Sequence, residues 1–169
     1  MNILVAMSGG VDSSVAAALL KEQGHRVIGA TLKLLRQETG FGCCGSTRDI
    51  DDARAVCAKL GIPHYVLDFA DDFQKNILDP FVGSYLSGET PNPCIACNRF
   101  IKFDALLKKA VVLGADAVAT GHYAQIDVRE ENGKTVRRLR RAADPKTRPT
   151  ACVPLFCNAE WIRCNPRFR

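Results

Sequence analysis

The sequence has no long hydrophobic run. None of its apolar stretches approaches the roughly 18–20 residues that a helix needs to cross a bilayer. The N-terminus also has no basic segment followed by an apolar stretch and a cleavage site, because residues 3–6 already have the pattern of a strand. These absences argue against a membrane span and a secretory signal. We therefore expect a cytoplasmic protein with no membrane partner.

A complete zinc-binding pattern is also missing. Eight cysteines are many for 169 residues, and in a cytosolic enzyme they suggest metal or catalytic roles before disulfides. Two Cys-x-x-Cys motifs would be strong evidence for zinc, but only Cys94 and Cys97 have this spacing. Cys43 and Cys44 are adjacent, which is poor chelating geometry, and loop packing is the simpler interpretation of that pair.

The clearest motif that is present lies at residues 8–14, Ser-Gly-Gly-Val-Asp-Ser-Ser. An apolar strand pattern precedes it and a helical pattern follows it, so the turn joins the carboxyl end of a strand to the amino end of a helix. Unpaired N–H groups and the helix dipole favour an anion there. Gly9 and Gly10 allow close backbone approach, and Ser8, Ser13 and Ser14 can add hydroxyl donors.

Asp12 lies inside this predicted anion site. A carboxylate cannot bind an anion directly, so its presence makes sense if a divalent cation such as Mg²⁺ lies between the two. The motif follows neither the Walker-type pattern nor G-x-G-x-x-G. It resembles the S-G-G-x-D-S "PP-loop" of ATP pyrophosphatases, which cleave ATP between its α and β phosphates.

Strands and helices alternate along the rest of the chain, which predicts an α/β fold with a doubly wound parallel sheet. A hairpin is expected across Asn132-Gly133, followed by an irregular tail. Ligands of such sheets gather at the carboxyl ends of the strands. Three stretches should therefore share one edge: residues 8–14, the region after Leu32, and Gly121-His122. The expected elements are strands 26–32, 63–68 and 117–120, and helices 47–60, from 71 onward, and 99–113.

Cys94 and Cys97 are expected just before a helix, where the helix dipole lowers a thiol pKa, and Arg99 and Lys102 act in the same direction. Three chemical roles are open. Cys97 is a catalytic thiolate, or the two cysteines form a redox disulfide, or they are half of a metal or iron–sulfur site. A purely structural role in a tight turn is the fourth possibility.

Several motifs occur in register along the chain: residues 8–14, Cys43-Cys44 before Asp49-x-x-Asp52-Ala53-Arg54, 60–63, Thr90-Pro91-Asn92-Pro93-x-x-x-Cys97-Asn98, Ile101-Lys102-Phe103, 114–116 and 119–123. Together, over residues 2 to about 146, they resemble the tRNA-specific 2-thiouridylase family.

The resemblance implies ATP-dependent 2-thiolation of the wobble uridine of tRNA. The uracil C2 oxygen attacks the α-phosphate of ATP, pyrophosphate leaves, and a persulfide sulfur on a second cysteine replaces AMP. It further implies that Cys97 is the first catalytic cysteine, that Asn92, Pro93 and Cys94 contact the target base, and that Mg²⁺, tRNA and a sulfur-carrier protein take part. Many members have Asp at the position of Cys94. The positions implied to contact ATP are Ala6, Met7, Ser8, Gly9, Gly10, Val11, Asp12, Ser13, Leu32 and Gly121.

The resemblance ends after residue 146. Family members continue with a tRNA-contacting Asp-Gln-Ser-Tyr stretch and further domains, whereas residues 147–169 show no apolar period. We expect a PP-loop domain at 1–146 and a disordered tail at 147–169, arising from a frameshift or truncation. Two other functions stay open: another PP-loop adenylating enzyme, such as an amidating synthetase, and a nucleotide-binding fragment without turnover.

The net charge of +5 is unevenly distributed. Residues 129–169 hold 11 Lys and Arg against 4 Asp and Glu, whereas residues 1–128 hold 12 against 14. This surplus suits a polyanion such as RNA. A solvated basic hairpin with a tail explains it equally well.

Overall fold

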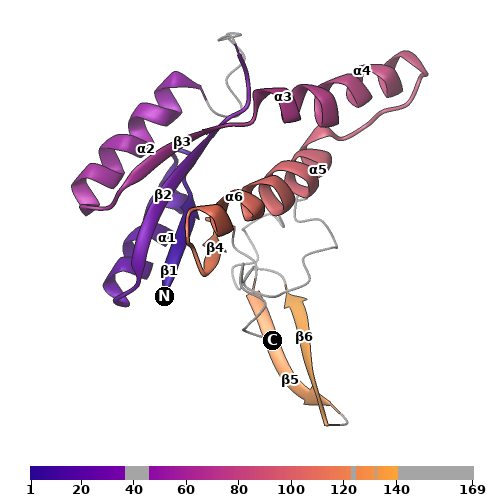
Figure 1. Cartoon of the computed structure of the whole chain (residues 1–169). Helices are drawn as coiled ribbons and strands as arrows, with labels where there is room; N and C mark the ends of the chain where they lie inside the picture. The colour runs from indigo at the N-terminus through magenta and orange to yellow at the C-terminus, as the bar shows by residue number, and fades with distance from the viewer. Residues whose placement is uncertain (37–45, 123–124, 132, 141–169) are drawn as a thin grey trace.

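Four parallel strands form the central sheet (Figure 1). The computed structural model describes residues 1–36, 46–122, 125–131 and 133–140. The sheet order is β3-β2-β1-β4, so the chain moves outward from β1 and later returns to β1's other side. The carboxyl ends of β1 and β4 therefore flank the topological switch point, where ligands of such sheets bind. The strands are β1 (Asn2–Ala6), β2 (Arg26–Lys33), β3 (His64–Asp68) and β4 (Ala117–Ala119).

Helices cover both faces of the sheet, which confirms the predicted doubly wound architecture (Figure 1). Side chains of β1 contribute to the packing on both faces, because successive side chains of a strand point to opposite faces of the sheet. Ile3 and Val5 pack with Ala17 and Ala53, which come from α1 (Val11–Glu22) and α2 (Thr47–Leu60). Leu4 packs on the other face, against Ile101 and Leu106 among others.

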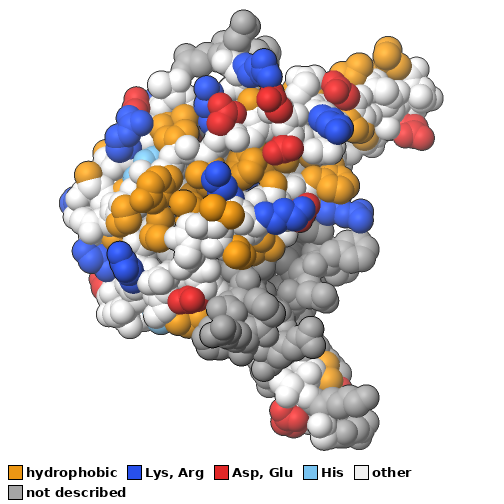
Figure 2. Space-filling model, viewed as in Figure 1, with side chains coloured by type: hydrophobic (Ala, Val, Ile, Leu, Met, Phe, Trp, Pro, Cys, Tyr) orange, Lys and Arg blue, Asp and Glu red, His pale blue; other side chains and the backbone are white. Residues whose placement is uncertain are grey.

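The second face carries two long helical runs. The first consists of α3 (Ala70–Phe73), η1 (Gln74–Leu78) and α4 (Asp79–Leu86), where η marks π-helical hydrogen bonding. The second consists of α5 (Pro93–Cys97), η2 (Asn98–Ala105) and α6 (Leu106–Val112). The end of α4 exposes the apolar side chains of Val82, Tyr85 and Leu86 (Figure 2).

The second run begins earlier than the sequence predicted. We expected a helix from Arg99, with Cys94 and Cys97 in the loop before it, and this was wrong. The Asn92 side chain accepts a hydrogen bond from the Cys94 N–H at 3.0 Å, and Pro93 occupies the first helical position. Both features favour a helix start. The two cysteines therefore belong to the first turns of the helix.

The predicted hairpin is present as a separate two-stranded antiparallel sheet of β5 (Gln125–Glu131) and β6 (Lys134–Arg140) (Figure 1). Gly133, at its turn, has a φ of 71°. The expected disordered tail at 147–169 and the pair Cys43-Cys44 lie outside the described residues. Within the described part of the chain, no helix is long and apolar enough to span a membrane.

Candidate active site

The glycine loop joins β1 to α1 as predicted. The Met7 N–H donates to the Ala30 carbonyl at 2.8 Å, which extends the pairing of β1 and β2 by one residue. The chain then turns, and α1 begins after Gly10, which is its N-cap residue and makes no side-chain cap hydrogen bond. The first N–H groups of the helix therefore receive no acceptor from the cap side chain and point toward the carboxyl edge of the sheet. This is the expected anion-binding arrangement.

The serine hydroxyls hold the loop in shape. Ser13 and Ser14 both donate to the Gly10 carbonyl, at 3.1 and 2.8 Å. The Ser8 N–H donates to the Ser13 hydroxyl oxygen at 3.2 Å, and Ser13 is only 3% exposed. In this structure the hydroxyls that we expected to face an anion are used within the loop. Backbone N–H groups are left as the donors that an anion would meet.

Gly9 fits tightly against the start of α2. It has a φ of 75°, in the left-handed region that favours glycine, and a Cβ there would lie 2.7 Å from the carbonyl oxygen of Asp49. Asp49 is itself fixed, because its side chain and that of Ser46 form a reciprocal capping box at the N-terminus of α2. The loop is thus supported on one side by the backbone of α2.

Gly121 brings the end of β4 against the other side of the loop. A Cβ at this position would lie 2.7 Å from the Ser13 backbone nitrogen and 2.8 Å from the Asp12 carbonyl carbon. Two of the three stretches expected to share one edge are therefore in direct contact. The third stretch follows β2 at the same edge, where Leu32 is 9% exposed and packs in the core.

His122 connects this edge to the helix that carries Cys97. Its ring centroid lies 6.3 Å from that of Phe103 in η2, and its backbone N–H donates to the Thr120 hydroxyl oxygen at 3.4 Å. Burial lowers the pKa of His122 below its ordinary value, and the positive charge of Lys102 lowers it further. The sequence predicted His122 at this edge and Lys102 near the cysteines, but it did not indicate that Lys102 and Phe103 lie beside His122. Their proximity depends on the packing of η2 against the end of β4.

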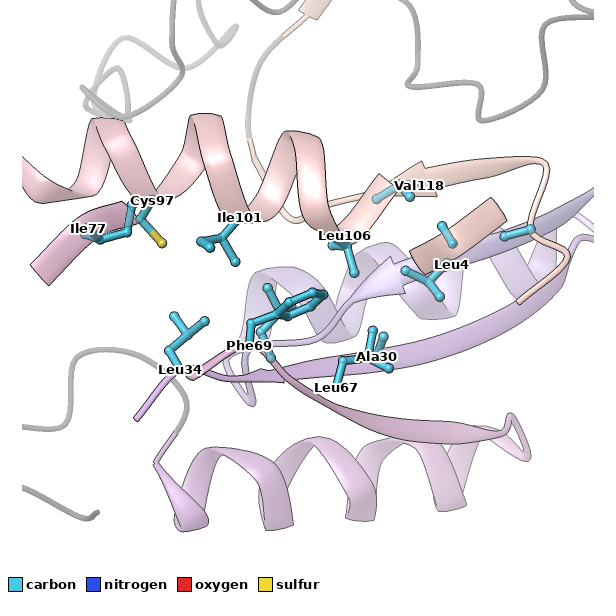
Figure 3. Packing of buried hydrophobic residues seen from close by; sticks show 13 residues of the cluster. Leu4, Ala30, Leu34, Leu67, Phe69, Ile77, Cys97, Ile101, Leu106 and Val118 are labelled. Carbon is cyan, nitrogen blue, oxygen red and sulfur yellow. The ribbon is translucent and has the colours of Figure 1, made fainter. Parts of the chain in front are cut away.

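Cys97 lies in the hydrophobic core (Figure 3). It is 6% exposed and belongs to the same cluster as Leu34, Phe69 and Ile77, with its sulfur pointing inward. Leu34 and Phe69 directly follow the carboxyl ends of β2 and β3, so Cys97 is at the correct edge of the sheet. Its burial differs from the exposed, electropositive setting that is typical of a reactive thiolate.

Cys94 has the opposite environment, since it is exposed. No disulfide joins it to Cys97. Asn98, directly after Cys97, is 2% exposed and begins the π-helical segment η2. Short π-helical segments often occur at functional sites.

The described residues contain no group of three or more His, Cys, Asp or Glu side chains that could hold a metal ion. Cys94 and Cys97 would supply two ligands, fewer than an iron–sulfur cluster needs, so a complete cluster site does not fit these residues. Asp12 is exposed at the start of α1 and could hold Mg²⁺ only together with other ligands, such as phosphate oxygens.

A groove of about 400 Å³ lies elsewhere on the helical face, between α3–η1 and η2–α6. It is lined by residues that include Phe69, Phe100, Asp104 and Lys108. None of its lining residues belongs to the predicted site.

Comparisons with known proteins agree with the motifs. Residues 1–150 match the family model described as "tRNA methyl transferase HUP domain". The tRNA-specific 2-thiouridylase MnmA of Clostridium botulinum is 54% identical over 140 residues, which make up 80% of this chain and 38% of that protein. The enzyme of the same name from Carboxydothermus hydrogenoformans is 55% identical over 138 residues, which cover 78% of this chain and 38% of that protein. The chain thus spans about two fifths of the length of these relatives.

One solved structure has a similar fold. It is a predicted subunit of a tRNA methyltransferase from Methanocaldococcus jannaschii, with a TM-score of 0.50 and 20% sequence identity. The match covers 71% of this chain and 53% of that one. It supports the α/β fold.

Proposed function

This chain belongs to the tRNA methyl transferase HUP-domain family, and we propose that it carries the ATP-binding, base-activating part of a tRNA uridine 2-thiolating enzyme. The contact of Gly121 with the backbone of Asp12 and Ser13 carries this proposal. It holds the end of β4 against the first turn of α1 at the switch point of the sheet, and the contact of Phe103 with His122 links this edge to the helical run of Cys97. Such a site suits the phosphates of a nucleotide.

ATP is proposed to lie with its phosphates against the N–H groups at the start of α1. Gly9 and Gly121 support this arrangement indirectly, because neither has room for a Cβ and the loop is therefore held closely between α2 and the end of β4. Mg²⁺, held by Asp12 and phosphate oxygens, would supply charge neutralisation. The residues proposed to contact ATP are Ala6, Met7, Ser8, Gly9, Gly10, Val11, Asp12, Ser13, Leu32 and Gly121.

The first chemical step is adenylation of the base. The C2 oxygen of the uracil attacks the α-phosphorus of ATP, the bond to the bridging oxygen breaks, and pyrophosphate leaves with the electron pair. The N3 proton of the base is released. Oriented backbone N–H groups at the start of α1 stabilise the charge that develops on the phosphates, which is the usual electrostatic contribution to such transfers.

The second step is sulfur delivery. Asn92, Pro93 and Cys94 would contact the target base, and Cys97 would act as the first catalytic cysteine. The terminal sulfur of a persulfide on a second cysteine, loaded by a sulfur-carrier protein, would attack C2 of the activated base and displace AMP. The Cys97 thiolate would then attack the inner sulfur and break the S–S bond, which releases the thiolated base and leaves a disulfide between Cys97 and the second cysteine. An external thiol reductant would restore both thiols. Because Cys97 is only 6% exposed, its thiol would have to turn out of the core cluster to take part.

The tRNA is proposed to contact the basic C-terminal part of the chain. Five Lys or Arg residues and three Asp or Glu residues lie on β5 and β6. Cationic side chains bind the phosphate backbone of RNA and make that binding salt-dependent.

Exchange of radioactive pyrophosphate into ATP, with and without tRNA, tests the proposal. We expect exchange that depends on tRNA, is lost in Asp12→Asn, and is unchanged in the control Glu22→Gln, which alters an exposed acid at the other end of α1. Exchange without tRNA would instead indicate an adenylating enzyme with another substrate, such as an amidating synthetase. ATP binding without any exchange would indicate a nucleotide-binding protein without turnover.

A further inference from the structure

Lys102 has an unusual position for a lysine. Among the lysines and arginines whose side chains the structure describes, only Lys33 and Lys102 are not largely exposed. Lys33 pairs with Asp68 at 3.6 Å. Lys102 forms no ion pair with any residue of the described ranges. Lys102 is half-buried as a residue, and no carboxylate of the described ranges pairs with its ammonium group, so that group is available to an anionic ligand.

The position of Lys102 indicates which anion it would meet. Its charge acts on His122, and the next residue, Phe103, packs its ring against the His122 ring at 6.3 Å. His122 directly follows Gly121, whose backbone touches Asp12 and Ser13. Lys102 therefore lies on the β4 side of the glycine loop. The opposite side is closed by Asp49 of α2, which packs against Gly9.

The glycine loop itself lacks a cation. Residues 8–14 contain no Lys or Arg, and Asp12 adds a negative charge. In a Walker-type loop a lysine within the motif reaches the β- and γ-phosphates. Here the neutral N–H donors at the start of α1 face a polyanionic ligand without such a residue. A cationic side chain, in addition to the Mg²⁺ proposed at Asp12, would therefore come from another element.

We propose that Lys102 supplies this charge and is a phosphate-binding residue, whose ammonium group contacts the phosphates of the ATP bound at the glycine loop. This inference rests on the proposed function, because it requires ATP at that loop. A lysine acts as a compact point charge with three donors, which suits phosphate oxygens. The role accounts for the absence of an ion-pair partner for Lys102 among the described residues.

Nucleotide titrations of the full chain test the inference. Binding of ATP with Mg²⁺ and of adenosine is measured by calorimetry for the wild type, Lys102→Met, Lys102→Arg and the control Lys109→Met, which alters an exposed lysine of α6. Loss of one hydrogen bond to a charged group should weaken ATP binding about 10- to 100-fold in Lys102→Met. Adenosine binding should stay unchanged, Lys102→Arg should keep most of the ATP affinity, and Lys109→Met should match the wild type.

Two results would overturn the inference while leaving the proposed function intact. One is wild-type ATP affinity in Lys102→Met. The other is an equal loss of ATP and adenosine binding, which would show a structural role. Failure of the wild type to bind ATP at all would contradict the proposed function itself. A melting curve of each variant confirms that it is folded.

Discussion

Replacing Gly121 with alanine should force apart the two segments that form the candidate nucleotide site. The added Cβ would lie 2.7 Å from the Ser13 nitrogen, 2.8 Å from the Asp12 carbonyl carbon and 3.0 Å from the Asp12 Cβ. Two of these three atoms are backbone atoms, so no side-chain rotation relieves the overlap. Either the end of β4 or the first turn of α1 has to move by several tenths of an ångström.

Overpacking of this kind costs about 1–3 kcal/mol. For a domain of this size, 1 kcal/mol lowers the melting temperature by roughly 2–4 °C, so a fall of about 2–12 °C is expected. ATP affinity should fall at least about tenfold, because the donors at the start of α1 are displaced from the end of β4.

Gly83→Ala is the matched control for this prediction. Gly83 lies within α4, and a Cβ there would meet no atom within 4 Å. Alanine favours a helix interior over glycine by about 0.5–1 kcal/mol, so this variant should be slightly stabilised and should bind ATP as the wild type does. Urea denaturation and nucleotide titration measure both effects. Wild-type stability and affinity in Gly121→Ala would refute the close contact of β4 with the glycine loop.

Three further predictions concern the cysteine helix and His122. Asn92→Ala removes the side-chain oxygen that accepts a hydrogen bond from the Cys94 N–H, and it should lower the free energy of unfolding by about 0.5–2 kcal/mol in urea denaturation. Asn92→Ser keeps a capping oxygen and should lose less stability. Equal losses in the two variants would exclude the capping role. Brief iodoacetamide treatment followed by peptide mass mapping should label exposed Cys94 well before buried Cys97, and the reverse order would contradict the packing of Cys97. Burial and Lys102 lower the pKa of His122 below its ordinary 6.5, so the unfolded state takes up the proton first and stability should fall as the pH drops below about 6.5. In denaturation series at pH 5–8, His122→Gln should reduce the slope of the unfolding free energy against pH. Part of the slope should remain because burial also lowers the pKa of His64. An unchanged slope would remove His122 as its source.

The strand–loop–helix unit around residues 8–14 could be predicted because its signals are local. An apolar run, two glycines and a helical pattern follow one another directly, and the structure has β1, the loop and α1 at those positions. The parallel order of the sheet followed from the alternation of strands and helices. The shared edge followed from the rule that ligands bind at the carboxyl ends of the strands.

The start of α5 was missed although its signal was present. The sequence predicted a helix only from residue 99, with Cys94 and Cys97 before it. An asparagine followed by proline also marks an N-cap and first helical position, and this is the role of Asn92 and Pro93 in the structure. The π-helical segments could not be predicted, because the side-chain pattern does not specify a shift of the backbone hydrogen-bond register.

The burial of Cys97 and the contact of His122 depend on tertiary packing. Cys97 precedes Ile101 by four residues, and this helical spacing places it on the apolar face that the cluster buries. That relation appears only when the helix is extended back to Pro93. The contact between Phe103 and His122 joins residues far apart in the chain, and no local pattern indicates it.

A crystal structure of this chain with Mg²⁺ and a non-hydrolysable ATP analogue tests the central claim most directly. Phosphate density is predicted against the backbone N–H groups at the start of α1, between Gly9 and Gly121, with the Lys102 ammonium group within hydrogen-bond distance. Nucleotide density in the groove lined by Phe69, Phe100 and Asp104, with none at the glycine loop, would contradict the account.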